Sequence, residues 1–143
     1  MALNDEERKT MVGLEIEKAE RFLKQADMMT DLEQWDRAAN RYYYACFHAV
    51  QALFIHKGLS SRRHKGMLTQ FGLHFVKTGI IEDRYGAFLT RMECGRRGAS
   101  PLCAPLFRVR HLFYSFYQSL RSHTSIPDVN NSCNVGRRVI IID

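Results

Sequence analysis

The chain has 143 residues, the size of one ordinary domain and enough to bury a substantial core. Hydrophobic residues make up 45% of it and charged residues 25%, a balance typical of a globular protein. No stretch approaches the roughly 18 apolar residues of a membrane-spanning helix. The charged N-terminus leads into no apolar signal segment, so we expect no membrane association and a cytoplasmic location. The net charge of +6 favours partners that carry phosphate.

The cysteines and most histidines carry no recognisable metal-binding pattern. The four cysteines, at positions 46, 94, 103 and 133, lack CxxC spacing, and we read them as free thiols. The histidines at 56, 74, 111 and 123 also lack the spacing of metal ligands. We therefore predict neither a metal site nor a cofactor.

The first half of the chain predicts two long helices. Asn4 followed by Glu7 resembles a helix-capping pair, and apolar residues then recur at helical spacing through residue 29. The segment 30–33, Thr-Asp-Leu-Glu, fits the capping-box pattern and predicts the start of a second helix that stops at Gly58.

Further helices are predicted beyond a basic loop at residues 60–66. Residues 67–76 have helical spacing and predict a third helix that ends before Gly79, and a shorter amphipathic segment follows up to residue 93. The first 93 residues show no alternating pattern of a β-strand. The sequence thus predicts an all-α protein.

The composition changes after Glu93. The last 50 residues contain no Lys and no Glu, yet hold all three prolines and three of the four cysteines. Residues 106–120 are aromatic enough to predict one more helix, whereas 123–143 look disordered. We therefore divide the chain into a helical bundle at 1–93, a final helix of atypical composition within 94–122, and a disordered tail at 123–143.

One stretch of the second helix combines a helical pattern with reactive side chains. Arg41 and His48 are seven residues apart, which returns to the same helix face about 10 Å further along the axis. Tyr44 and Gln51 share that face, and the other faces are apolar or small. A guanidinium and an imidazole on a buried helix need partners or a cleft. Without further information, a structural pair or a cleft lining explains them better than catalysis does.

Three sequence blocks stand out together: Trp35 to Leu53, with Asn40-Arg41 and Phe47-His48 at its centre, then Arg63-His-Lys-Gly66, then Phe71 to Gly79. They closely resemble the HEPN domain family, an all-helical prokaryotic family. The blocks occur in order, and the resemblance covers residues 14–93.

The resemblance implies an antiparallel four- to five-helix bundle that forms a homodimer. Such proteins are often encoded beside a minimal nucleotidyltransferase as a toxin-antitoxin pair. Many members are metal-independent ribonucleases that carry Arg and His with four to six residues between them, as Arg41 and His48 do.

The chain departs from the family pattern at two places. Members that are modified by their nucleotidyltransferase carry a tyrosine two residues after the motif histidine, where this chain has Val50, so AMP transfer to that position is not supported. The lysine- and glutamate-rich last helix of the family is also missing beyond Glu93. An altered reading frame near Cys94 would explain this, a hypothesis that resequencing the source DNA tests. In that case the fold lacks its native closing helix.

The function expected from these residues is metal-independent RNA cleavage. His48 would move a proton and Arg41 would stabilise the charge on the phosphate, with Tyr44 between them. A two-fold dimer would let Arg41 of one copy act near His48 of the other. The substrate-binding set adds Tyr43 and the basic residues of the second block, Arg63, His64 and Lys65. The competing hypothesis is a non-catalytic module that binds a nucleotide or the nucleotidyltransferase through the same cleft, with Tyr43, Tyr44 and His64 as its lining.

Overall fold

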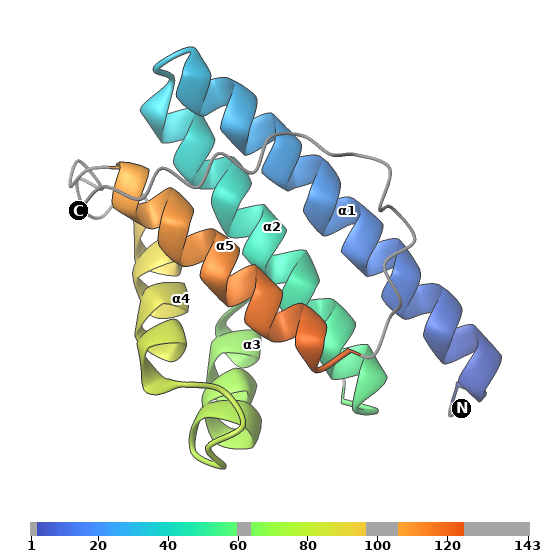
Figure 1. Cartoon of the computed structure of the whole chain (residues 1–143). Coiled ribbons are helices and arrows are strands. Elements are labelled where there is room, and N and C mark those ends of the chain that lie inside the picture. The colour runs from blue at the N-terminus through green and yellow to red at the C-terminus, as the bar shows by residue number, and fades with distance from the viewer. Residues whose placement is uncertain (1–2, 60–63, 97–105, 125–143) are drawn as a thin grey trace.

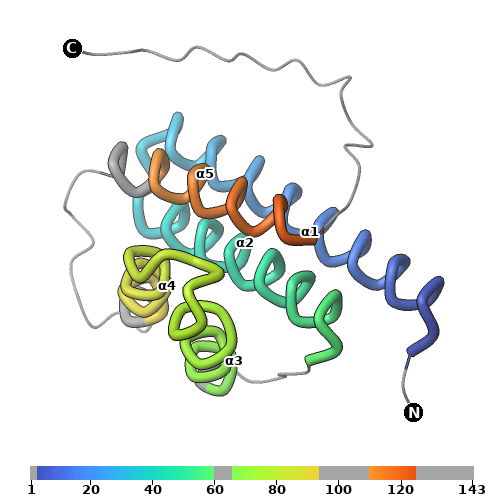
Figure 2. Tube along the Cα trace, turned by 60° about the horizontal axis from the view of Figure 1, so that its bottom comes forward, coloured from blue at the N-terminus to red at the C-terminus, as the bar shows by residue number. Residues whose placement is uncertain are grey.

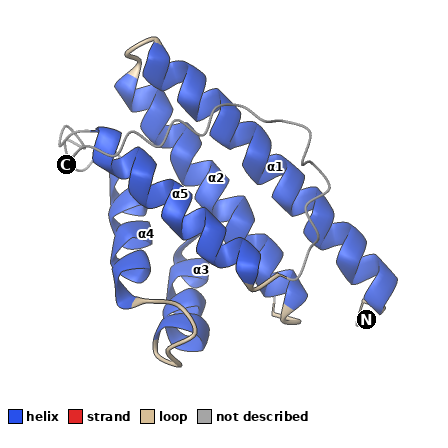
Figure 3. Cartoon of the chain, in the orientation of Figure 1, coloured by secondary structure: helices blue, strands red, loops and turns tan. Residues whose placement is uncertain are grey.

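The computed structural model describes residues 3–59, 64–96 and 106–124. Within these ranges the regular elements are all helices, as Figure 3 shows. They are α1 (Asp5–Asp31), α2 (Trp35–His56), α3 (His64–Phe71), a π-helical turn η1 (Gly72–Val76), α4 (Asp83–Arg96) and α5 (Leu106–Ser122). The predicted all-α bundle is therefore confirmed.

The bundle is built around α2. Helix α1 runs antiparallel to it along most of its length, and α5 lies beside both (Figure 1). Figure 2 shows α3 and α4 on the other side of α2, so that α2 has neighbours on most of its surface. Ten of its 22 residues are buried. The prediction of a central second helix is confirmed.

Helix α1 packs against α2 through a narrow stripe. Its N-terminus is capped as expected, since the Asn4 side chain accepts a bond from the Glu7 amide at 2.8 Å and the Glu7 carboxylate accepts one from the Asn4 amide at 3.0 Å. Five positions are buried, at spacings of four and three residues: Val12, Ile16, Ala19, Leu23 and Ala26. The two alanines let α1 approach the alanine-rich face of α2 closely.

The predicted capping box at residues 30–33 is wrong. Helix α1 continues to Asp31, and the Thr30 hydroxyl donates to the Ala26 carbonyl one turn back at 2.9 Å instead of capping α2. The chain reverses with Glu33 in the left-handed region, at φ 57°. Helix α2 then begins after Gln34, which makes no side-chain capping bond.

The third predicted helix is divided into two parts. Helix α3 is followed by the wider π-helical turn η1, and the chain then turns at Gly79, where a φ of 76° suits a residue without a Cβ. Phe75 of η1 is buried and stacks on Phe54 of α2 at 5.7 Å between ring centroids. This contact packs the segment from α3 to α4 against the central helix α2.

Helix α5 packs into the same core despite its unusual composition. Phe113, Phe116 and Leu120 are fully buried, and Phe116 contacts the rings of Tyr85 and Phe88 on α4. The predicted helix at 106–120 is thus present. The division of the chain at residue 93 remains a prediction, and residues 125–143 of the predicted tail lie outside the described ranges.

Polar contacts tie α5 to α1. The Asp27 carboxylate accepts the hydroxyl protons of Tyr42 at 2.7 Å and Tyr114 at 2.5 Å, and Arg110 lies 3.3 Å from it. About two turns earlier on α1, Glu20 accepts a hydrogen bond from Tyr117 at 3.0 Å and one from Arg121 at 3.3 Å. The pKa values of Tyr42, Tyr114 and Tyr117 are raised, mainly by burial and in addition by the neighbouring carboxylates. These hydroxyls therefore stay protonated and act as donors.

Among the cysteines with described side chains, Cys46 is a buried free thiol in α2. Its burial raises the pKa of the thiol well above the ordinary value, which makes it a poor nucleophile. The other three cysteines lie outside the part of the chain whose side chains are described.

Candidate active site

The polar stripe of α2 gathers on one aromatic ring of α1, that of Phe22. The His48 imidazole stacks on this ring at 5.4 Å between centroids and 5° between planes. Tyr44 stacks on it at 5.5 Å, and the Arg41 guanidinium carbon lies 5.6 Å from its centroid. A cation over an aromatic face is favourable and keeps its outer donors available. Phe22 thereby holds three predicted site residues in one cluster.

Glu15 fixes the orientation of the His48 ring. Its Oε2 lies 2.7 Å from His48 Nδ1, and its Oε1 accepts a bond from Lys18 Nζ at 2.8 Å. An ionised carboxylate only accepts, so Nδ1 carries the proton. Among the described residues Nε2 of His48 has no polar partner. The imidazole therefore presents Nε2 as the nitrogen that can take or give a proton.

The charge of Glu15 is stabilised by the same contacts. Partial burial by itself raises the pKa of the Glu15 carboxyl, but the hydrogen bonds from His48 and Lys18 outweigh burial and leave this pKa below its usual value. The side chains of His48 and Glu15 are 17% and 12% exposed, so the pair is shielded but not closed off.

Replacing Glu15 by Gln is expected to change the pH dependence of stability. A carboxyl whose folded pKa is lowered stabilises the fold above its unfolded pKa of about 4.3, and this stabilisation is lost as the pH falls through the lower folded value. The variant should be about 1 kcal/mol less stable at pH 7, and its deficit should shrink towards pH 3. Urea unfolding followed by circular dichroism between pH 3 and pH 7 measures this difference.

Glu17→Gln is the matched control, because Glu17 lies on the same helix with a 68% exposed side chain. Its free energy of unfolding should equal that of the wild type at every pH. If the same held for Glu15→Gln, the bond to His48 would contribute nothing to stability.

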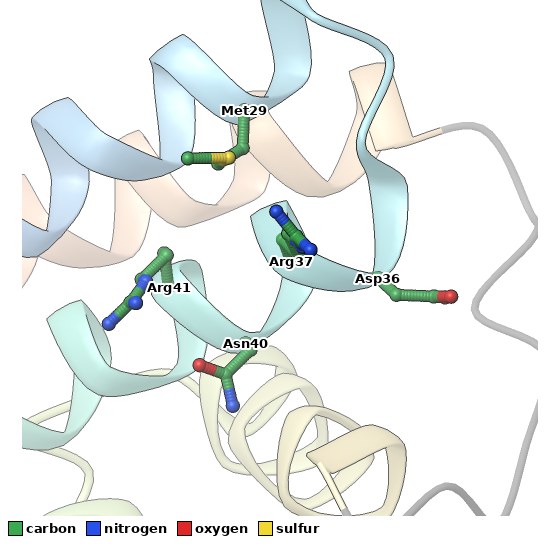
Figure 4. A pocket seen from close by; sticks show the side chains of 5 residues that line it. All are labelled: Met29, Asp36, Arg37, Asn40 and Arg41. Atoms are coloured by element: carbon green, nitrogen blue, oxygen red, sulfur yellow. The ribbon is translucent and has the colours of Figure 1, made fainter.

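A pocket of about 340 Å³ adjoins this cluster at the N-terminal end of α2. Figure 4 shows its five lining residues, of which Met29 comes from α1 and the others from the first turns of α2. Arg41 belongs both to this pocket and to the cluster on Phe22. The two features therefore meet at Arg41.

The remaining predicted site residues are either buried in the core or lie outside the described part of the chain. Tyr43 is fully buried and meets Tyr44 edge-on at 5.5 Å, so its ring belongs to the core in this structure. His64 and Lys65 start α3, but their side chains lie outside the described part, as does all of Arg63. The structure thus brings Arg41, Tyr44 and His48 together and leaves the basic block unplaced. All of these roles remain predictions.

Sequence reasoning missed Glu15 and Phe22. A signal was available, because they are seven residues apart on one face of α1, as Arg41 and His48 are on α2. Because α1 and α2 are antiparallel, the earlier residue on α1 lies beside the later residue on α2. Glu15 therefore contacts His48, and Phe22 contacts Arg41. Pairing the two seven-residue repeats would have found both contacts.

In the part of the chain with described side chains, no cluster of three or more His, Cys, Asp or Glu residues is placed to bind a metal ion. None of the described helices combines the length and the apolar character needed to cross a membrane.

The fold is that of an all-helical HEPN bundle, and the family comparison agrees. The model of the HEPN domain matches residues 13–99, and the chain belongs to this family.

Its relatives include archaeal and bacterial proteins. A protein of Methanocaldococcus jannaschii named "Putative toxin MJ0605" is 38% identical over 89 residues, which cover 62% of this chain and 66% of the relative. A UPF0332 protein of Pyrococcus horikoshii is 45% identical over 58 residues, 41% of each chain, and one of Thermotoga maritima is 41% identical over 75 residues, 52% of this chain and 57% of the relative. The matches therefore span between 41% and 66% of the length of these relatives.

Proposed function

We propose that this protein is a metal-independent endoribonuclease of the HEPN toxin type, with His48 and Arg41 as its catalytic residues. The observation that carries the proposal is the arrangement around Phe22. His48 is held at Nδ1 by Glu15 with Nε2 left available, and Arg41 lies on the same aromatic ring. A histidine positioned by a carboxylate beside a fixed guanidinium supplies both parts of phosphodiester cleavage.

The reaction uses the 2′-hydroxyl of the RNA itself. His48 Nε2 accepts the 2′-hydroxyl proton while the 2′-oxygen forms a bond to the phosphorus. The bond from phosphorus to the 5′-oxygen of the next nucleotide breaks, and that oxygen takes up a proton from water, while His48 afterwards releases its proton to the solvent. The products are a 2′,3′-cyclic phosphate and a 5′-hydroxyl. Arg41 offsets the negative charge that builds on the phosphoryl oxygens, with two donors in fixed geometry.

A homodimer completes the site in this proposal. The helix rise separates the backbones of Arg41 and His48 by about 10 Å along α2, so in this proposal the pair of one copy is completed by that of a second copy. A two-fold axis beside α2 would place Arg41 of each copy near His48 of the other. Tyr44, between them on Phe22, would stack on a base of the RNA.

The toxin role and the partner are proposed from the relatives. Two relatives from M. jannaschii bear the name of a putative toxin. We extend that role to this chain, with cytoplasmic RNA as its target and a minimal nucleotidyltransferase as the partner that restrains it.

A binding module without catalysis is the second candidate. The observation that favours it is the shielding of the pair, since His48 is only 17% exposed and its ring is covered by Phe22. In this case Arg41 would bind the phosphate of a nucleotide or of RNA, and the Glu15–His48 bond would serve as a structural link between α1 and α2.

Incubation with labelled transfer RNA in the presence of EDTA distinguishes these functions. The proposed enzyme cleaves the RNA and leaves 2′,3′-cyclic phosphate ends, but it does not cleave the same sequence made with 2′-O-methyl riboses. An Arg41→Ala preparation, purified identically, controls for contaminating nuclease. Intact RNA after incubation with a folded wild-type protein would reject the ribonuclease and favour the binding module.

A further inference from the structure

We infer that the pocket at the start of α2 binds the RNA nucleotide next to the scissile phosphate, with Arg37 as its phosphate-binding residue. This inference rests on the proposed function, whose site it extends. The pocket is lined by Met29, Asp36, Arg37, Asn40 and Arg41, and it has a volume of about 340 Å³. That volume suits part of a nucleotide held at an open surface.

Arg37 continues the polar stripe by one helical turn. Arg37, Arg41, Tyr44 and His48 follow one another at spacings of four, three and four residues, so they share one face of α2. Arg37 and Arg41 start about 6 Å apart along the helix axis. This rise is comparable to the step between neighbouring phosphates of a single strand. The stripe therefore follows the direction in which a bound RNA backbone would run.

The pocket arginines differ from most others in having no carboxylate partner. Among the arginines with described side chains, five pair with an acidic residue within 4.0 Å: Arg8, Arg21, Arg84, Arg110 and Arg121. Within the same part of the chain, Arg37 and Arg41 have no ion pair. Two uncompensated guanidinium groups one turn apart attract a polyanion.

The other lining residues suit the rest of a nucleotide. Met29 is half-buried on α1 and offers a polarisable apolar surface to a ribose or base. The Asn40 amide both donates and accepts, as an exposed base edge requires. In Figure 4 Arg37 lies beside Met29, while the Asp36 carboxylate points away from both arginines and leaves their side of the pocket to an anion.

Binding of an RNA that cannot be cleaved tests the pocket independently of catalysis. The probe is a short, fluorescently labelled single strand with 2′-O-methyl riboses, and its affinity is measured by anisotropy at several salt concentrations. Arg37→Ala should weaken binding by about tenfold and lower the salt slope by about one phosphate contact. Arg37→Lys should recover part of the affinity.

Arg91→Ala is the matched control. Arg91 is an exposed arginine of α4 that likewise has no ion pair in the described part of the chain, and its loss removes the same charge. Its affinity and salt slope should equal those of the wild type. If Arg37→Ala and Arg91→Ala weakened binding equally, or if the wild type did not bind the probe, the pocket would not be an RNA site.

The two proposals fail in different ways. A wild type that binds the probe through Arg37 but does not cleave ordinary RNA supports the pocket and rejects the ribonuclease. A wild type that cleaves RNA while Arg37→Ala binds and cleaves normally supports the ribonuclease and rejects the pocket.

Discussion

Replacing His48 by Ala is expected to lower kcat/KM for RNA cleavage by about 10²- to 10⁴-fold, the usual contribution of a general acid or base. The variant lacks Nε2, the nitrogen that would take the 2′-hydroxyl proton. The fold should survive, because Glu15 keeps its bond to Lys18 and the His48 side chain fills only a shielded edge of the core. Single-turnover cleavage of a labelled RNA, with circular dichroism of the same sample, measures both effects.

His74→Ala is the control for this result, since His74 is an exposed histidine of η1 on the far side of α2. It should cleave at the wild-type rate. Equal rates for wild type, His48→Ala and His74→Ala would show that the cleavage does not come from this site.

Replacing Phe116 by Ala is expected to destabilise the protein by about 3–5 kcal/mol, as for other large-to-small changes of buried aromatic residues. Phe116 is fully buried, and its ring lies within 6.1 Å of those of Phe71, Tyr85 and Phe88. The cavity would open where α5 meets both α3 and α4. Since the free energy of unfolding of a domain is about 5–15 kcal/mol, a large share of the stability would be lost. Thermal and urea unfolding measure the change.

The exposed residue Gln118 lies two positions away on α5, and Gln118→Ala is the matched control with no expected effect. An unchanged stability of Phe116→Ala would mean that α5 does not pack against α3 and α4 in solution. It would also favour the hypothesis that the reading frame changes near Cys94. A large loss shows instead that this C-terminal sequence closes the bundle.

The helices were predictable because their patterns are local. A helix that faces one neighbour has buried residues at spacings of three and four, as α1 does at Val12, Ile16, Ala19, Leu23 and Ala26. A central helix has apolar residues on most of its surface, as α2 does. The Asn4–Glu7 cap depends on a few adjacent atoms and was predicted correctly. Thr30 was misread because its hydroxyl can bond within α1 as easily as it can cap α2, and pattern alone does not decide between them.

The candidate site was predictable only on α2. The spacing of Arg41, Tyr44 and His48 places them on one face of the helix, and the family resemblance predicted a catalytic function for that face. Their partners depend on how α1 lies against α2, which is a tertiary property. The same holds for the pairing of Asp27 with Tyr114, 87 positions apart in the chain.

The antiparallel pair α1–α2 contains every group of the proposed catalytic centre that the structure places. Phe22 and Glu15 come from one helix, Arg41, Tyr44 and His48 from the other, and Met29 and Arg37 line the adjoining pocket. Contacts between neighbouring helices of a hairpin are close in sequence, which favours their fast formation. Helix α5 supplies no reacting group of the proposed centre, and its buried aromatic side chains pack against the core around α2 instead. A change in its sequence would therefore reach the site only through the packing of α1 and α2.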